Sequence, residues 1–206
     1  YIFDDFWAKK APDVSLGFNN GFYVGAGSVK AYYASEEKKY TVSSKILQEL
    51  FPDRLGGLSD EELYGVGTLE MKPLQSAYIQ VAGDRKTAKG LWAANGNSAM
   101  ITAAGPTTRW TWGFFAVDFI FEDGQWRIWH LQYLEDINVQ AGHDWSEEAD
   151  DWEDRPEFAP LKECVPPEPD VKAVLRVPYT PDRPFTKTPP VPEPYETFSE
   201  TFSYGA

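Results

Sequence analysis

Apolar side chains recur at helical spacing at the start of the chain. Residues 1–12 carry an apolar stripe and two late lysines, and Pro12 ends the pattern, which predicts the last turns of a helix. Residues 14–25 then indicate either a strand, a turn and a strand, or a loop with aromatic anchors. Because Tyr1 lies inside the helical pattern and is not Met, we expect the natural N-terminus to precede it.

Three further helices are expected before the pattern changes. Ser28 can cap a helix with an apolar side, and residues 42–51 form a short amphipathic run that a proline ends. In residues 58–63, Ser59 and Glu62 have the spacing of a capping box, which satisfies orphan amides at a helix start. Two glycines follow soon afterwards, so this last helix must be short.

From residue 74 the period changes to two, which is typical of strands. Residues 74–82 and 87–94 predict a first pair, and residues 97–104 can extend the second strand up to a break at 105–107. A long strand follows at 108–122, then an Asp-Gly turn and a returning strand at 125–136. Helices followed by an antiparallel meander predict an α+β fold.

The composition shifts after residue 143. An acidic stretch is typical of a solvated loop, and residues 171–179 could add an edge strand. The remainder is rich in proline but carries regularly placed aromatic rings, so it is either a disordered tail or an extended arm docked on this subunit or a neighbouring one. We therefore divide the chain into residues 1–143 and an acidic loop with an extended C-terminal arm, 144–206.

Charge and composition exclude several classes of binding partner. A net charge of −13 over 206 residues argues against nucleic acid and against an anionic membrane surface. No apolar run is long enough to span a membrane. Cys164 is the only cysteine, so an internal disulfide is impossible, and a reducing cytoplasm is favoured.

The motif Asp123-Gly124-x-Trp126-x-Ile128, between an aromatic strand and a returning strand, resembles the last hairpin of the SnoaL-like and nuclear-transport-factor-2-like superfamily. Residues 11–33 resemble the stretch after the first helix of such proteins, and the likeness covers residues 1 to about 140. The resemblance implies a cone-shaped, curved antiparallel sheet packed on N-terminal helices, as in cystatin-like folds. It also implies an apolar pocket at the wide mouth of the cone and a homodimer or small homo-oligomer.

The superfamily includes polyketide cyclases, ketosteroid isomerase, scytalone dehydratase, bile-acid dehydratase and non-catalytic binding domains. The resemblance therefore implies a cofactor-free lyase or isomerase that dehydrates, isomerises or cyclises an apolar, ring-containing small molecule by acid–base proton transfer. The alternative is a non-catalytic binding or assembly domain of the same fold.

Alternation along the last strand places His130 on one face and Tyr133 and Glu135 on the other. Comparison with scytalone dehydratase implies that the second face lines the pocket. We expect the pocket walls to include Trp7, Trp92, Phe115, Val117, Trp129 and Leu131.

Glu135 is the leading catalytic candidate, because a carboxyl at the mouth of an aromatic pocket loses water and its pKa rises toward neutrality. Tyr133 could donate a hydrogen bond to a substrate carbonyl. The alternatives are a solvated strand-end residue for Glu135 and core packing for Tyr133. Asp5, on the first helix, is a further acid–base candidate or else an exposed helix carboxylate.

His130 is an alternative catalytic residue, but its face predicts a structural or interface role. His143, beside an aspartate, could form a base with its orienting acid or lie by chance in an acidic loop. No spacing indicates a metal site or a phosphate loop, so no cofactor is expected.

Two departures from the dehydratases weaken a shared mechanism. Their Tyr/Asp pair on the first helix corresponds to positions at or before Tyr1. The positions matching their two catalytic histidines hold Leu74 or Gln75, and Ser98.

Overall fold

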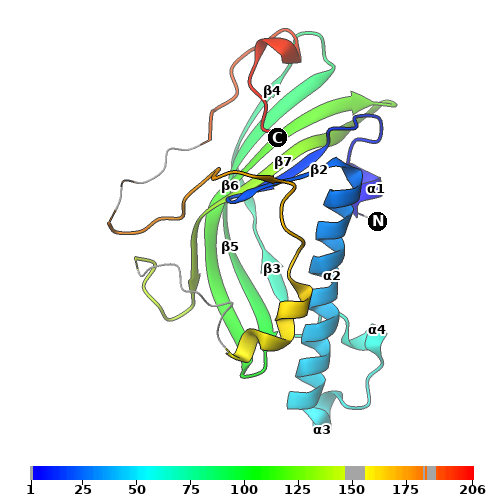
Figure 1. Ribbon diagram of the computed structural model, residues 1–206, viewed down its shortest axis with the longest axis vertical. Helices are drawn as coiled ribbons and strands as arrows, with labels where there is room; N and C mark the ends of the chain where they lie inside the picture. The colour runs from blue at the N-terminus through cyan, green and yellow to red at the C-terminus, as the bar shows by residue number, and fades with distance from the viewer. Residues whose placement is uncertain (1, 147–155, 183, 185–188) are drawn as a thin grey trace.

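The computed structural model describes residues 2–146, 156–182, 184 and 189–206. Within these residues, eight strands form one mixed sheet in the order β3-β5-β6-β7-β1-β2-β8, and β4 also pairs with β5 (Figure 1). The strands are β1 (Ser15–Phe18), β2 (Gly21–Val24), β3 (Leu69–Met71), β4 (Leu74–Val81), β5 (Thr87–Thr102), β6 (Gly105–Glu122), β7 (Gln125–Gln140) and β8 (Val171–Lys172). The predicted α+β class is confirmed.

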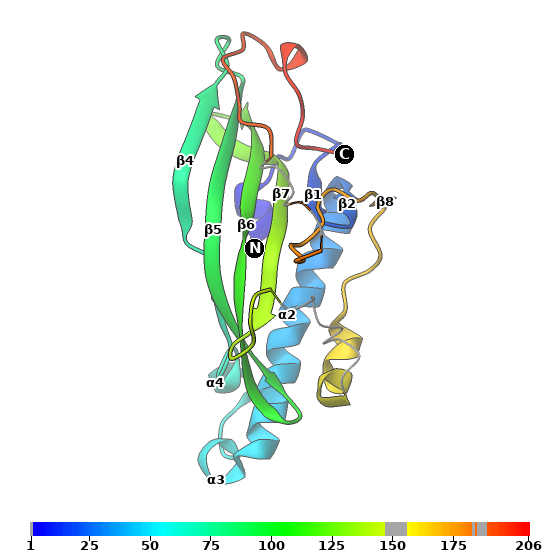
Figure 2. The ribbon, with the colours of Figure 1, turned by 90° about the vertical axis from the view of Figure 1, so that its left-hand side faces the viewer.

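The long helix α2 runs alongside the sheet, as the turned view shows (Figure 2). The α-helices are α1 (Ile2–Phe6), α2 (Gly25–Leu50), α3 (Pro52–Leu55) and α4 (Asp60–Leu63), and the 3-10 helices are η2 (Pro156–Cys164) and η3 (Phe198–Glu200). Among the described residues, none of the helices combines the length and the apolar character needed to cross a bilayer.

The long hairpins follow the alternation in the sequence. Asp123 and Gly124 both have positive φ, 48° and 79°, as a two-residue type I′ turn requires. The capping box of α4 is also confirmed: the Ser59 hydroxyl accepts from the Glu62 amide, and the Glu62 carboxylate accepts from the Ser59 amide. The expected break after the second strand lies slightly earlier than predicted, because β5 ends at Thr102 and residues 105–107 already belong to β6. The preceding hairpin turns within two alanines, and Gly105 supplies a positive φ of 114°.

The expectation of a purely antiparallel sheet was wrong. β1 pairs in parallel with β7, with Leu16 opposite Leu131 and Gly17 opposite Gln132. This pairing joins segments more than one hundred residues apart, which no local pattern reveals. It places the β1–β2 turn beside the second half of β7.

The two helices expected from Ser28 and from residues 42–51 are one continuous helix, α2. No glycine or proline interrupts the intervening residues, so nothing ends the helix there. Ser28 is not the N-cap residue, because Val24 occupies the N-cap position. The Asp170 carboxylate accepts a hydrogen bond of 2.8 Å from the Val24 amide. The first helix, α1, is only five residues long.

One end of the sheet is closed by an apolar core. Trp7 is fully buried there, with its ring stacked on Phe3 at 5.6 Å between centroids. The rest of this cluster comes from the segment before β1, from β1, β2, β6 and β7, and from the start of α2; it includes Val14, Leu16, Tyr23 and Val29. Trp7 is therefore part of a packed core.

The end of the chain docks on the opposite face of the sheet. The tail, residues 189–206, reaches the β4–β5 turn, where the Gly83 amide donates to the Tyr195 carbonyl at 3.0 Å. Further along the tail, Gln132 Nε2 donates to the Tyr204 carbonyl at 2.7 Å. Of the two alternatives for this segment, these residues form an arm docked on their own subunit. The predicted edge strand is shorter than expected, since β8 has two residues. The division at residue 143 stays a prediction.

Candidate functional site

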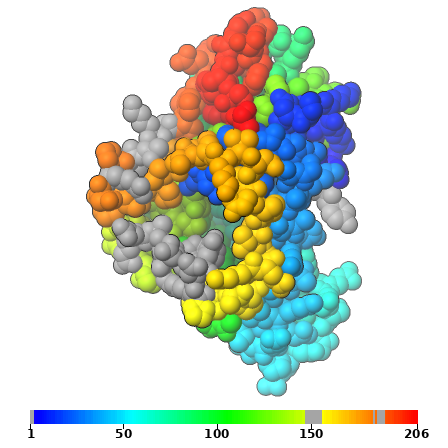
Figure 3. Space-filling view, in the orientation of Figure 1, coloured from blue at the N-terminus to red at the C-terminus, as the bar shows by residue number. Residues whose placement is uncertain are grey.

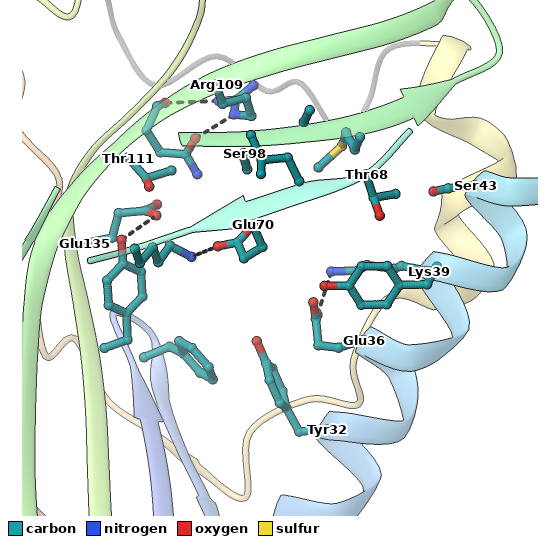
Figure 4. Close-up of a pocket in the computed structure, with 18 of the residues that line it drawn as sticks. Tyr32, Glu36, Lys39, Ser43, Thr68, Glu70, Ser98, Arg109, Thr111 and Glu135 are labelled. Carbon is teal, nitrogen blue, oxygen red and sulfur yellow. Dashed lines mark hydrogen bonds and ion pairs between the residues drawn. The ribbon is translucent and has the colours of Figure 1, made fainter. Parts of the chain in front are cut away.

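A cavity of about 430 Å³ lies between α2 and the sheet (Figure 4). Side chains of α2 reach it from one side, and β3, β5, β6 and β7 supply the other walls. Glu135 enters the cavity from β7, opposite Tyr32 and Glu36 of α2. The site thus depends on one long helix facing three long strands.

Register sets which side chains enter this space. Phe115 pairs with Tyr133, and Gly113 pairs with Glu135. Past Glu135 the register shifts, since the next pair is Trp112 with Ile137. Asp136 is therefore the extra residue of a β-bulge, a feature that re-aims neighbouring side chains. Tyr133, Glu135 and Asn138 all line the cavity.

The Glu135 carboxyl has a perturbed pKa. Burial raises its pKa above the ordinary 4.5, and Asn138, Lys72 and Arg109 offset part of that rise by favouring the anion. The Tyr133 hydroxyl donates to Glu135 Oε2 at 3.5 Å. Burial also raises the pKa of Tyr133, with the Glu135 charge adding to the effect, so its hydroxyl keeps its proton. The two groups form an acid and a hydrogen-bond donor side by side.

The remaining charges of the cavity are paired. Arg109 Nε donates to Asn138 Oδ1 at 2.5 Å, and Lys72 forms an ion pair with Glu70. On α2, Lys39 Nζ lies 2.6 Å from the Glu36 carboxylate. The Lys72 ammonium also lies 4.6 Å from the centroid of the Tyr133 ring, where a cation is attracted by the π-system. Positive charge is thus held close to Tyr133 and Glu135.

The expected pocket walls lie elsewhere. Trp7 belongs to the closed apolar core, and Leu131 packs against that core. Trp92 meets Phe119 edge to face at 6.3 Å. Phe115 lies behind Tyr133, with 4.7 Å between ring centroids, and Val117 is buried. None of these five lines the cavity, because the aromatic half of the sheet packs on α1 and β1 and the open space lies further along β6 and β7.

Trp129 also lies away from the cavity, and a bulge in β7 explains its position. His130 pairs with Asp118, but the next pair is Ile128 with Phe119, so Trp129 is the extra residue of another bulge. Its ring stacks on His130 at 4.5 Å, and its Nε1 donates to Asp13 at 2.9 Å. Strict alternation predicts that Trp129 and Tyr133 share one face of β7. The bulge takes Trp129 out of that alternation.

Asp5 and His130 do not enter the cavity either. Asp5 is exposed on α1. His130 is buried on the face that the tail covers, with Nδ1 2.9 Å from Asp118. Asp118 also binds the Lys89 ammonium at 2.6 Å and accepts from the Tyr204 amide at 2.8 Å. This network joins the tail to the sheet and is separate from the cavity.

Several cavity residues were missed by the sequence reasoning: Tyr32, Glu36, Lys39, Glu70, Lys72, Arg109, Thr111 and Asn138. Alternation along β6 could have found two of them, because Arg109 and Thr111 continue the face of Gly113. The Thr111 hydroxyl is buried at the cavity wall, and a hydrogen bond between it and Tyr133 offsets part of the rise in the Tyr133 pKa. The described residues hold no group of three metal-ligating side chains.

Comparison with known proteins adds little to this geometry. No family model matches the sequence, and no curated protein matches it. Among solved structures, a variant of a function-unknown protein from Mycobacterium tuberculosis gives a TM-score of 0.42 at 16% identity, over 74% of this chain and 68% of that chain. The intermembrane space region of the chloroplast protein ARC6 gives 0.28 at 11% identity, over 54% of this chain and 98% of that one. Both likenesses are too distant to bear on function.

Proposed function

We propose that this protein is a SnoaL-like, cofactor-free lyase or isomerase that transfers protons on a ring-shaped, largely apolar compound. In this proposal the curved sheet and α2 form the cone, and the cavity of about 430 Å³ is its binding site. The observation that carries the proposal is the Glu135 carboxyl, with its raised pKa, beside the Tyr133 hydroxyl inside that cavity. A carboxyl whose pKa approaches the working pH can both take and return a proton.

The chemistry is proton abstraction next to a carbonyl. Glu135 takes a proton from the α-carbon, and the C–H electron pair moves into the carbonyl group to form an enolate. Tyr133 donates a hydrogen bond to the enolate oxygen. In a substrate with a β,γ double bond, return of the proton to the γ-carbon completes an isomerisation. In a substrate with a hydroxyl group on the β-carbon, the enolate electrons form the α,β double bond as the C–O bond breaks, and the departing hydroxyl group takes the proton and leaves as water.

The charges of the cavity support an intermediate of this kind. The lining residues include three cations and three acids: Lys39, Lys72, Arg109, Glu36, Glu70 and Glu135. Once Glu135 has taken the proton, this set carries one net positive charge, which matches the single negative charge of an enolate. The rings of Phe18, Tyr32 and Tyr40 offer apolar surface to a flat substrate.

Proton exchange tests the proposal without knowledge of the natural substrate. A panel of cyclic ketones is incubated with the protein in deuterium oxide, and α-hydrogen exchange is followed by proton NMR. We expect the wild-type protein to catalyse this exchange and Glu135→Gln to abolish it. The matched control Glu37→Gln changes an exposed position on α2 and should leave the exchange rate unchanged. Ketones that bind but do not exchange would favour the alternative, a non-catalytic binding domain.

We also propose a homodimer formed through the uncovered part of the outer sheet face. Met71, Trp110 and Trp112 are 47%, 46% and 40% exposed, and Met71 and Trp110 both pair with Asn97. Exposed apolar surface of this kind is typical of an interface. Sedimentation of the wild type and of Trp110→Lys measures this directly, with a dimer expected only for the wild type. A cytoplasmic location stays a prediction.

A further inference from the structure

The segment behind the cavity, residues 173–179, crosses the β1–β2 turn and the bulge of β7. We call it the strap, and the chain leading into it runs along α2 in the space-filling view (Figure 3). It lies outside the region in which sequence reasoning sought the site. Two sets of contacts link it to Glu135.

The first set acts through Asp136, the bulge residue next to Glu135. Arg176 Nε donates to Asp136 Oδ1 at 2.5 Å, and the two side chains are only 2% and 7% exposed. The Tyr179 amide donates to the Asp136 carbonyl at 2.7 Å. The Arg176 guanidinium also lies 5.3 Å from the centroid of the Phe114 ring. Both the side chain and the backbone of the bulge are thus fixed by the strap.

The second set acts through Asn19 in the β1–β2 turn. Asn19 Nδ2 donates to the Glu135 carbonyl at 2.8 Å, and its Oδ1 accepts from the Glu135 amide at 2.8 Å. The backbone carbonyl of Asn19 in turn accepts from the Leu175 amide at 2.8 Å. The strap therefore holds the residue that clamps both backbone groups of Glu135.

A gain in stability alone does not explain why the Arg176–Asp136 ion pair is buried. A buried ion pair loses hydration on both sides, and apolar residues of similar volume often replace it at no cost. Its position is informative, since Asp136 is the extra residue of the bulge and directly follows Glu135 in β7. Gly113, opposite the bulge, admits the close backbone: a Cβ there would lie 2.3 Å from the Leu134 carbonyl oxygen.

We propose that Arg176 and Asn19 are positioning residues, through which the strap holds the bulge of β7 and aims the Glu135 carboxyl into the cavity. The proposal rests on the proposed function, because it assigns a purpose to the orientation of Glu135. Loss of either contact lets the bulge relax and admits water to the carboxyl. Lost burial then lowers the pKa of Glu135 toward its ordinary value.

The test is a titration of Glu135 by carbon NMR of protein carrying ¹³C-labelled glutamate, with the signal assigned through Glu135→Gln. The double variant Asp136→Ala/Arg176→Met removes both buried charges together, so neither is left unpaired. The matched control Glu168→Ala/Lys172→Met removes an exposed ion pair of 2.8 Å just before the strap. Asn19→Ala removes the other clamp and serves if the double variant does not fold. Arg176→Lys keeps the cation and tests rescue.

We expect a lowered Glu135 pKa in Asp136→Ala/Arg176→Met and in Asn19→Ala, partial recovery in Arg176→Lys, and the wild-type value in the control. Folded variants that retain the wild-type pKa would overturn the positioning role and leave the proposed function intact. A wild-type Glu135 that titrates at its ordinary pKa would remove the basis of both proposals. The two failures are therefore distinguishable, and neither readout requires the natural substrate.

Discussion

Replacing Glu135 by Gln should make the folded state more resistant to alkaline pH. Burial raises the pKa of Glu135 in the folded protein above its ordinary value of 4.5. The folded state therefore binds the proton more tightly than the unfolded chain does. The stability linked to this proton is fully present below pH 4.5 and is lost as the pH rises through the raised, folded-state pKa. Gln cannot ionise, so the variant does not suffer this loss.

The size of the effect follows from linkage. Each unit by which the folded-state pKa is raised corresponds to about 1.4 kcal/mol of unfolding free energy between the two limits of pH. For a chain of this length, each 1 kcal/mol moves the melting temperature by about 2–4 °C. Asn138, Lys72 and Arg109 lower the pKa of Glu135 and so reduce the total. The variant should gain stability over the wild type progressively as pH rises, with little difference in acid.

Urea unfolding between about pH 4 and pH 9 measures this difference, with the melting temperature as a second readout. Glu37→Gln is the control, because it removes the same kind of charge from an exposed position on α2. A Glu135→Gln difference that does not change with pH would refute the reasoning, since it would mean that Glu135 titrates alike in the folded and unfolded chains.

Three further outcomes are expected. Tyr133→Phe should slow α-hydrogen exchange by about 10²-fold or more with folding preserved, as measured by NMR and circular dichroism; an unchanged rate would remove Tyr133 from the mechanism. Gly113→Ala should destabilise the protein in urea, because its Cβ would lie 2.3 Å from a backbone oxygen. Lys89→Met should cost about 3–5 kcal/mol, because Asp118 would remain buried without its cation, whereas the exposed Lys86→Met should be neutral.

Much of the local structure could be predicted from the sequence, because it depends on neighbours along the chain. The Asp123-Gly124 turn needs positive φ at two adjacent residues, and the capping box of α4 needs two side chains three residues apart. Alternation also placed Tyr133 and Glu135 on one face of β7 and His130 on the other. These features require no knowledge of distant segments.

The cavity walls could not be predicted in the same way. Alternation gave the wrong face for Trp129, because a one-residue bulge reverses the alternation there. The pairing partner decides where such a bulge forms. The place of Trp7 could not be predicted, because it depends on whether α1 packs on a closed core or beside an opening. Lys39 and Lys72 come from segments with no local signal of a shared site, and only α2 and β3 bring them to one cavity.

The sequence by itself determined the Asp123-Gly124 turn, the short capped helix, the long strands and the face on which Glu135 lies, since each follows from backbone preferences or from side-chain period. The tertiary structure alone decided the parallel pairing of β1 with β7, the hydrogen bond from the Val24 amide to Asp170 and the contact of the strap with Asp136. Each of these joins groups separated by tens of residues or more, and their proximity depends on the packing of the whole chain.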